Sequence, residues 1–127
     1  MGAPNRQCVL WLEGQAKRVD LRFTRPNESS DGGAVLLRAA DDRLGLTKRM
    51  AACVLDSRQS GKVLHPTVEL LRERVFAIAC GYPDCNDSRQ LRVDPVMKLV
   101  CGRRPGDEQA LASQPTLSRF ENAPRRR

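Results

Sequence analysis

Apolar residues recur at helical spacing along most of the chain, and this pattern predicts its secondary structure. The clearest case lies between Pro66 and Gly81, where the spacing is typical of one long amphipathic helix. Its apolar stripe consists of Val68, Leu71, Val75, Ile78 and Ala79, and its charged positions include Glu69, Arg72 and Glu73. We expect the stripe to face the core and the charged positions to face water.

Two further helices are predicted upstream. The first begins near Ser30 and ends at Gly45, and the second begins at Thr47 and ends before the turn-rich segment 56–61. In the first, the predicted core positions are Leu36, Leu37, Ala40 and Leu44, and the predicted solvent positions are Arg38, Asp41, Asp42 and Arg43. In the second, the predicted core positions are Met50, Ala51, Val54 and Leu55.

Short helices are predicted downstream of Gly81. Asp84 or Asn86 can cap one that runs through Leu91. Asp94 with Pro95 starts another, which Gly102 closes. A polar linker follows from Arg103, and the last helical element runs from about Pro115 to Glu121.

The N-terminal part of the chain has a different pattern. Val19, Leu21 and Phe23 alternate with polar residues, which predicts a half-buried strand. The apolar cluster 8–12 is compatible with another short strand and with a poorly ordered leader.

Together the elements predict an all-α fold, a small bundle of four or five short helices with one N-terminal β-strand and a flexible C-terminal tail. The expected organisation is a leader over 1–28, a helical domain over 29–102, and a linker and tail over 103–127 with a short helix near 115–121. The low aromatic content, 4%, favours such a core of aliphatic side chains over a sandwich or barrel.

Composition restricts the environment and the chemistry. No run approaches the roughly 18 apolar residues of a membrane span, so we expect a cytoplasmic protein without a membrane partner. The five cysteines are irregularly spaced and lack a paired zinc knuckle, which favours reduced thiols that pack as small hydrophobes over a metal site built with His65.

The chain carries a net charge of +7, mainly from arginine. Guanidinium groups match phosphate oxygens in two-pronged geometry, so the surplus fits a polyanion such as DNA. An arginine-rich proteome encoded by a GC-rich genome accounts for the same surplus equally well.

Five ordered blocks of sequence carry a resemblance to a known family. They are SSDGGAVLLRAADDRLGL at 29–46, AACVLDSR at 51–58, HPTVELLRERVFAIACGYPDCND at 65–87, LRVDPVMKLVCGR at 91–103, and LASQPTLSRFENA at 111–123. The chain resembles the N-terminal region of DDE transposases of bacterial insertion sequences, the group called transposase DDE domain group 1. The resemblance implies a segment that binds the DNA ends of an insertion sequence during transposition and recombination, close to the nucleoid.

The same resemblance implies that the catalytic domain, with its metal-binding acidic triad, begins just after this region. The chain is therefore expected to be a truncated transposase fragment without enzymatic activity and without a cofactor, whereas the complete enzyme would use a divalent metal such as Mg²⁺. Two alternatives stay open: a protein-interaction segment that docks on the catalytic domain or on a partner transposase subunit, and an inert remnant of a decayed element.

The segment near residue 115 carries the candidate DNA-binding residues. On a helix beginning near Gln114, Leu117 and Phe120 or Glu121 face inward. The predicted outward side chains, which can contact bases or phosphates, are Gln114, Thr116, Ser118 and Arg119. Arg125, Arg126 and Arg127 are expected to add nonspecific attraction to DNA. A linker helix that docks on a catalytic domain is the alternative interpretation of the same segment.

Asp84, Asp87 and Asp94 form the one acidic cluster that suggests metal catalysis. A two-metal site needs carboxylates that a rigid scaffold holds around cations roughly 4 Å apart. Asp84 and Asp94 instead stand where helices are predicted to begin, so we interpret them as helix caps.

Overall fold

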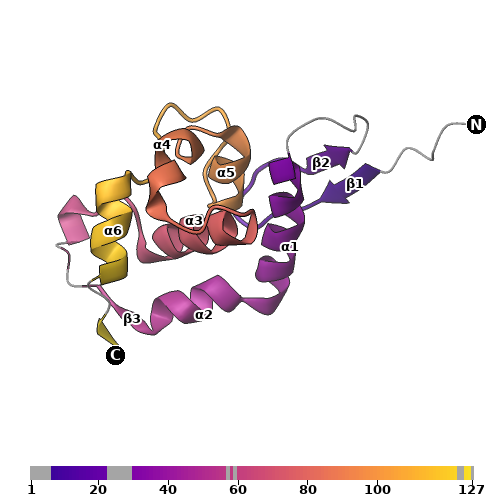
Figure 1. Ribbon diagram of the computed structural model, residues 1–127. Coiled ribbons are helices and arrows are strands. Elements are labelled where there is room, and N and C mark those ends of the chain that lie inside the picture. The colour runs from indigo at the N-terminus through magenta and orange to yellow at the C-terminus, as the bar shows by residue number, and fades with distance from the viewer. Residues whose placement is uncertain (1–6, 23–29, 57, 59, 123–124, 127) are drawn as a thin grey trace, which may run out of the picture.

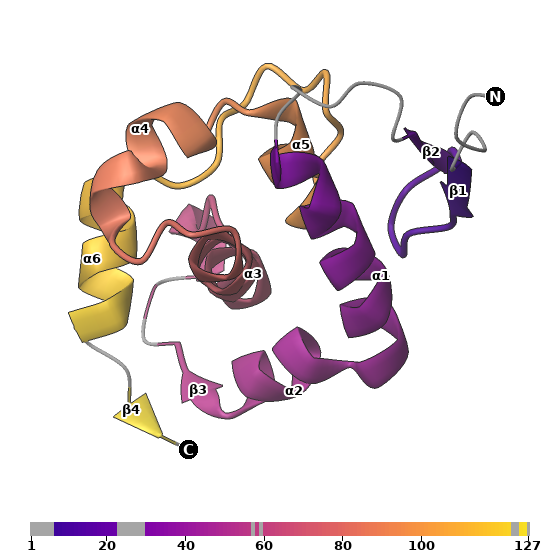
Figure 2. The same ribbon diagram turned by 45° about the vertical axis from the view of Figure 1, so that its right-hand side comes forward.

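The long helix predicted after Pro66 forms the centre of the fold. In the computed structural model this helix, α3, spans Thr67–Ala79. Figure 2 shows α3 nearly end-on, with the other helices arranged around it. The structure describes residues 7–22, 30–56, 58, 60–122 and 125–126.

Five more α-helices surround α3 in the described part of the chain (Figure 1). They are α1 (Ala34–Leu44), α2 (Leu46–Ala52), α4 (Ser88–Leu91), α5 (Pro95–Val100) and α6 (Gln114–Asn122). Short 3-10 helices occupy Ser30–Gly33 (η1), Ser60–Lys62 (η2) and Cys85–Asp87 (η3). The prediction of a small, mostly helical fold is confirmed. Among the helices described, none has the length and hydropathy needed to span a membrane.

Two antiparallel strand pairs complete the described fold. β1 (Gln7–Leu10) pairs with β2 (Val19–Arg22), with Leu10 opposite Val19. The predicted strand therefore exists and pairs with the apolar segment just before it, although Phe23 lies outside the described residues. Leu12, which follows β1, is buried and joins the main hydrophobic cluster.

The second pair corrects the predicted length of α2. Val54–Leu55 were expected to extend that helix, but they form β3 and pair with β4 (Arg125–Arg126). The helix ends at Ala52, and the backbone amide of Cys53 closes it by donating hydrogen bonds to the carbonyls of Met50 and Ala51. Two residues of the expected C-terminal tail thus have backbone partners 70 positions away in sequence, which no local pattern can indicate.

Apart from the end of α2, three predicted helix boundaries agree with the structure. The Asp84 carboxylate accepts from the amide of Asn86 at 2.8 Å, and the Asp94 carboxylate accepts from Val96 and Met97 at 2.8 and 3.2 Å. Gly45 ends α1 with φ of 65°, a left-handed conformation that favours glycine. The interpretation of Asp84 and Asp94 as caps is confirmed.

The predicted orientation of α3 and α1 is wrong. Glu69, Arg72 and Glu73, expected on the wet side of α3, are buried, and Ile78 is 52% exposed. On α1, Arg38 and Asp41 are buried instead of solvated, and Leu44 is 65% exposed. Both helices therefore turn a charged face towards the centre of the molecule and leave much of the apolar stripe outside.

Arg38 explains why α1 faces inward with its charged side. Its guanidinium is 2% exposed and donates to the carbonyl of Val100 at 2.7 Å, the carbonyl of Glu13 at 3.0 Å and the carboxylate of Asp42 at 2.8 Å. One side chain thereby joins α1, α5 and the turn after β1. A buried guanidinium is tolerated only when partners of this kind satisfy its donors.

A second set of polar contacts joins α1, α2 and α3. The Asp41 carboxylate accepts from the amide and the hydroxyl of Thr47, at 2.9 and 2.5 Å, and Arg72 donates to the same hydroxyl at 3.1 Å. Thr47 was expected to cap α2, but the helix begins one residue earlier, at Leu46. The free backbone amide of Thr47 donates instead to the Asp41 carboxylate of the preceding helix. These contacts fix the angle between α1 and α2.

Apolar packing fills the space around the polar contacts. The main cluster gathers residues from the hairpin, α1, α3, α4, α5 and the loop after α5, and Ala34, Met97, Val100 and Leu111 in it have no exposed surface. Cys101 is buried in this cluster and burial raises the pKa of its thiol well above the usual range. Together with the buried Cys85, it agrees with the expected role of cysteine as a small hydrophobe, whereas Cys53 is exposed.

We predict that Arg38→Met destabilises the fold by about 3 to 5 kcal/mol, because it leaves Asp42 and two backbone carbonyls without their buried donor. Urea unfolding followed by circular dichroism measures this loss. Arg43→Met, on the exposed face of the same helix, is the matched control and should change the free energy of unfolding little. Equal losses in the two variants would contradict the assigned role of Arg38.

Candidate nucleic-acid interface

α6 packs on the central helix through a second hydrophobic cluster. This cluster consists of Leu70 of α3, Cys85, Ala112 and Leu117, with Phe120 packed against it. Leu117 is 1% exposed, so the predicted inward side of α6 is confirmed. The cluster fixes the face that α6 turns to solvent.

An ion pair holds the C-terminal half of α6. The Arg74 guanidinium of α3 binds the Glu121 carboxylate and donates to the carbonyls of Pro83 and Asp84 at 3.0 and 3.2 Å. The other oxygen of Glu121 accepts from the thiol of Cys85 at 3.4 Å. The single carboxylate of α6 is thereby paired, and its negative charge is compensated on the inner side of the helix.

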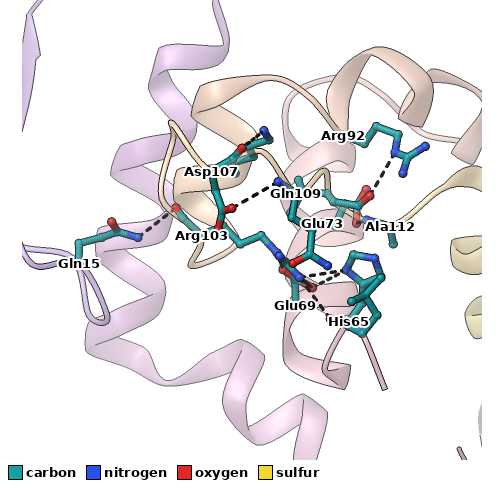
Figure 3. Close-up of polar contacts among 12 residues, drawn as sticks. Gln15, His65, Glu69, Glu73, Arg92, Arg103, Asp107, Gln109 and Ala112 are labelled. Atoms are coloured by element: carbon teal, nitrogen blue, oxygen red, sulfur yellow. Dashed lines mark hydrogen bonds and ion pairs between the residues drawn. The ribbon is translucent and has the colours of Figure 1, made fainter. Parts of the chain in front are cut away.

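The loop 101–113, which leads into α6, is held by charged contacts with α3 (Figure 3). Arg103 binds the buried Glu69 carboxylate, whose other oxygen lies 2.8 Å from His65 Nδ1. Lys98 donates to the carbonyl of Asp107 at 2.7 Å. His65 therefore takes part in a structural ion-pair cluster at the start of α3.

Glu73 supports the last residues before α6. Its side chain is 1% exposed, and one oxygen accepts a hydrogen bond from the amide of Ala112 at 3.2 Å, while the other has no hydrogen-bond partner among the described residues. Burial raises the pKa of Glu73 to about 8, and the nearby charge of Glu69 adds to the rise. The hydrogen bond from Ala112 and the charges of Arg92 and Arg74 oppose it. The contact that positions the start of α6 thus depends on a carboxyl group that titrates near neutral pH.

The predicted contact residues of α6 lie on its outer side to different degrees. Gln114 and Arg119 are exposed, whereas Thr116 and Ser118 are half-buried. Thr116 Oγ1 lies 3.1 Å from the Ser113 hydroxyl and accepts from Arg119 at 3.5 Å. Arg119 has no carboxylate partner among the described residues, so its guanidinium is available to an external anion.

The arginines at the C-terminus are only partly described. The backbone of Arg125 and Arg126 forms β4 beside β3, and their side chains are not described. Arg127 lies outside the described residues. The expected contribution of these three residues to DNA attraction stays a prediction.

The structure adds two residues that the sequence analysis did not select. Asn122 is exposed and its amide donates to the carbonyl of Ser118 at 2.9 Å, so it lies on the same face of α6 as Ser118 and Arg119. Helical spacing of three and four positions could have indicated it. Arg89 of α4 is exposed, and η3, which leads into α4, packs against α6. Tertiary packing alone brings η3, and α4 after it, towards α6, so the sequence pattern could not indicate Arg89.

The buried charges do not account for the basic surplus. Four basic side chains, Arg38, Arg72, Arg74 and Lys98, are buried, and so are four acidic ones, Asp31, Asp41, Glu69 and Glu73. These eight groups cancel in formal charge, so the formal surplus of +7 belongs to the remaining residues of the chain, several of which lie outside the described part. A net positive charge attracts polyanions.

The described residues do not fit the divalent metal that the resemblance implies for a complete enzyme. Among them, no group of three or more His, Cys, Asp or Glu side chains could hold a metal ion. Asp84 and Asp94 bind backbone amides at helix starts, and Asp87 lies where η3 meets α4. No catalytic step is therefore derived through a metal.

Comparison with known proteins gives one match. The family model described as Transposase DDE domain group 1 matches residues 12–127. No curated protein and no solved structure matches the chain. The matched range contains β2 and every described helix, so it includes α6 and the contacts that position it.

We predict that Glu73→Gln removes part of the pH dependence of stability. The folded protein keeps a proton on Glu73 up to about pH 8, whereas an unfolded glutamate releases it near its usual pKa of 4.5. Wild-type stability should therefore fall as pH rises through this window, and the variant should become the more stable protein at pH 9. Urea unfolding of both proteins at pH 5, 7 and 9 measures this, and a constant difference between them would contradict it.

Proposed function

The chain belongs to the family of transposase DDE domain group 1, and from this premise we propose that it binds DNA at the ends of an insertion sequence during transposition. In this proposal α6 is the element that contacts the DNA. The observation that carries it is the division of α6 into a buried side, with Leu117, and an outer side with Arg119 and Asn122, next to the exposed Gln114 at the start of the helix.

The outer side chains of α6 have the chemistry of base and phosphate contacts. Arginine donates two hydrogen bonds to guanine, and glutamine or asparagine pairs in the same way with adenine in the major groove. Gln114, Arg119 and Asn122 are exposed and supply these groups, and the hydroxyls of Thr116 and Ser118 add shorter donors. A helix of nine residues is about 14 Å long, which suits insertion into one stretch of major groove.

Rigid support of α6 favours this role over that of a loose linker. Leu117 is enclosed by the second hydrophobic cluster, and Arg74 binds Glu121 from the inner side. A helix fixed in this way loses little conformational entropy when it binds, so more of each contact contributes to affinity. We infer that Arg89, exposed on α4 directly after the η3 segment that packs against α6, adds a phosphate contact.

Strand cleavage is not assigned to these residues. Asp84 and Asp94, two of the three residues of the candidate acidic cluster, accept hydrogen bonds from backbone amides at helix starts. We propose that this region recognises DNA and acts together with a complete transposase, whose carboxylates hold the metal ions. Its place of action is then the DNA of the cell, close to the nucleoid.

We predict that Arg119→Ala weakens binding to a preferred DNA sequence about fivefold or more, since one base contact with two hydrogen bonds is worth about 1 to 3 kcal/mol. A preferred duplex is first selected from a random-sequence pool with the wild-type protein. Fluorescence anisotropy then compares the selected duplex with a scrambled one over a range of salt concentrations. Gln114→Ala should likewise reduce the preference for the selected sequence.

Arg18→Ala is the matched control for charge. Arg18 is exposed, lies 3.6 Å from Asp20, and belongs to the turn before β2, at the opposite end of the molecule from α6 (Figure 1). Its removal should lower affinity only slightly and equally for both duplexes. If Arg18→Ala and Arg119→Ala had the same effect on both duplexes, α6 would not be the element that recognises the DNA sequence.

A further inference from the structure

An apolar groove opens where α1, α2 and α3 meet. Its volume is about 190 Å³ and its exposed walls are almost entirely apolar. The residues that form these walls include Leu37, Ala40 and Leu44 of α1, Leu46 of α2, and Val75 and Ala79 of α3. Figure 2 shows that α1 and α6 lie on opposite sides of α3, so the groove is separate from the candidate nucleic-acid interface.

Large apolar side chains extend the groove onto the surrounding surface. Leu44 is 65% exposed, and Leu37 and Leu46 are 42% and 46% exposed. Ile78 of α3 and Met50 of α2 are exposed as well. Leu37, Leu44 and Leu46 line the same groove, and exposed apolar residues gathered in this way mark an interaction site, whereas single exposed leucines would have no such meaning.

The origin of the groove lies in the inverted orientation of two helices. Arg38 and Asp41 of α1 and Arg72 and Glu73 of α3 occupy the interior, so the apolar stripes of both helices remain outside on adjacent faces. Within each stripe the residues recur at three and four positions. Ridges with this spacing match the surface of another α-helix, which can lie in the groove between them.

The charges around the groove specify the kind of helix. The exposed charged side chains of α1 and α2 are Arg43, Lys48 and Arg49, and all three are basic. The same helices contain two acidic residues, and both have partners within the protein: Asp41 accepts hydrogen bonds from Thr47, and Asp42 binds Arg38. Complementarity therefore requires a partner with carboxylates beside its apolar residues.

From these observations we propose that the groove binds an amphipathic helix of a partner polypeptide, with an apolar stripe flanked by aspartate or glutamate. The apolar stripe contacts the walls formed by Leu37, Leu44 and Val75. The flanking carboxylates of the partner pair with Arg43 and Arg49. They also pair with Lys48, which gives up its ion pair with Glu13.

Two other occupants fit the groove less well. A second copy of the chain would bring Arg43 and Arg49 close to the same residues of its partner in a two-fold interface, and like charges there oppose association. DNA presents phosphates, which gain nothing from walls of leucine, valine and alanine. The groove thus favours an acidic helix, and the basic outer face of α6 favours DNA.

The direct test uses three synthetic helical peptides. One carries leucines at positions i, i+3, i+4 and i+7 with glutamates beside them, the second has lysines in place of the glutamates, and the third has serines in place of the leucines. Fluorescence anisotropy should show the glutamate peptide binding at least tenfold more tightly than the lysine peptide, and the serine peptide not binding. Equal binding of the glutamate and lysine peptides, or no binding of either, would overturn the proposal.

Two variants locate the binding site. Ala40→Gln places a longer polar side chain in the groove at an exposed helix position, so it should preserve the fold and reduce binding of the glutamate peptide at least tenfold. Arg43→Glu should weaken binding of the glutamate peptide and strengthen binding of the lysine peptide. Arg119→Glu, on α6 across α3 from α1, should do neither. Unchanged peptide binding in both groove variants would place the peptide elsewhere and overturn the assignment.

The peptide experiments can fail or succeed independently of the DNA experiments. Ala40→Gln adds no charge and lies across α3 from α6, so its affinity for the selected duplex should equal that of the wild type. Sedimentation of the free protein provides the last check. Self-association that Ala40→Gln abolishes would assign the groove to a second copy and contradict an acidic partner helix.

Discussion

The buried guanidinium of Arg38 is the interaction on which the arrangement of the helices depends. It binds backbone carbonyls at Glu13 and Val100 and the carboxylate of Asp42, so one residue fixes the N-terminal turn and α5 against α1. Each of the three guanidinium nitrogens donates to a partner, as a charge in the interior requires. Satisfying these groups takes precedence over burying every leucine of α1.

The central helix follows the same rule. Glu69, Glu73 and Arg74 of α3 are buried because Arg103, the amide of Ala112 and Glu121 reach them from other elements. These contacts place the loop 101–113 and α6 on one side of α3. On the other side, the apolar residues that a simple amphipathic helix would bury remain exposed beside α1 and α2. The charged interior therefore accounts both for the position of α6 and for the apolar groove.

Family membership and surface chemistry are the basis of the two proposed contacts, which use separate faces of the molecule. The surplus of positive charge lies outside the balanced set of buried ions, and α6 presents Gln114 and Arg119 on a rigid support. The groove between α1, α2 and α3 offers apolar contacts within a basic margin. Two faces of different chemistry suit a region of a transposase that acts within an assembly with DNA.

The sequence by itself determined the positions of the helices, the glycine at the end of α1, the Asp84 and Asp94 caps and the inward side of α6, because these depend on spacing and on bonds within a few residues. The tertiary structure decided which face of α1 and α3 is buried. Arg38 meets Val100 across 62 positions and Arg74 meets Glu121 across 47, and no local pattern contains either partner. A charged side chain belongs inside only when such distant groups satisfy it, so periodicity alone assigned it to water.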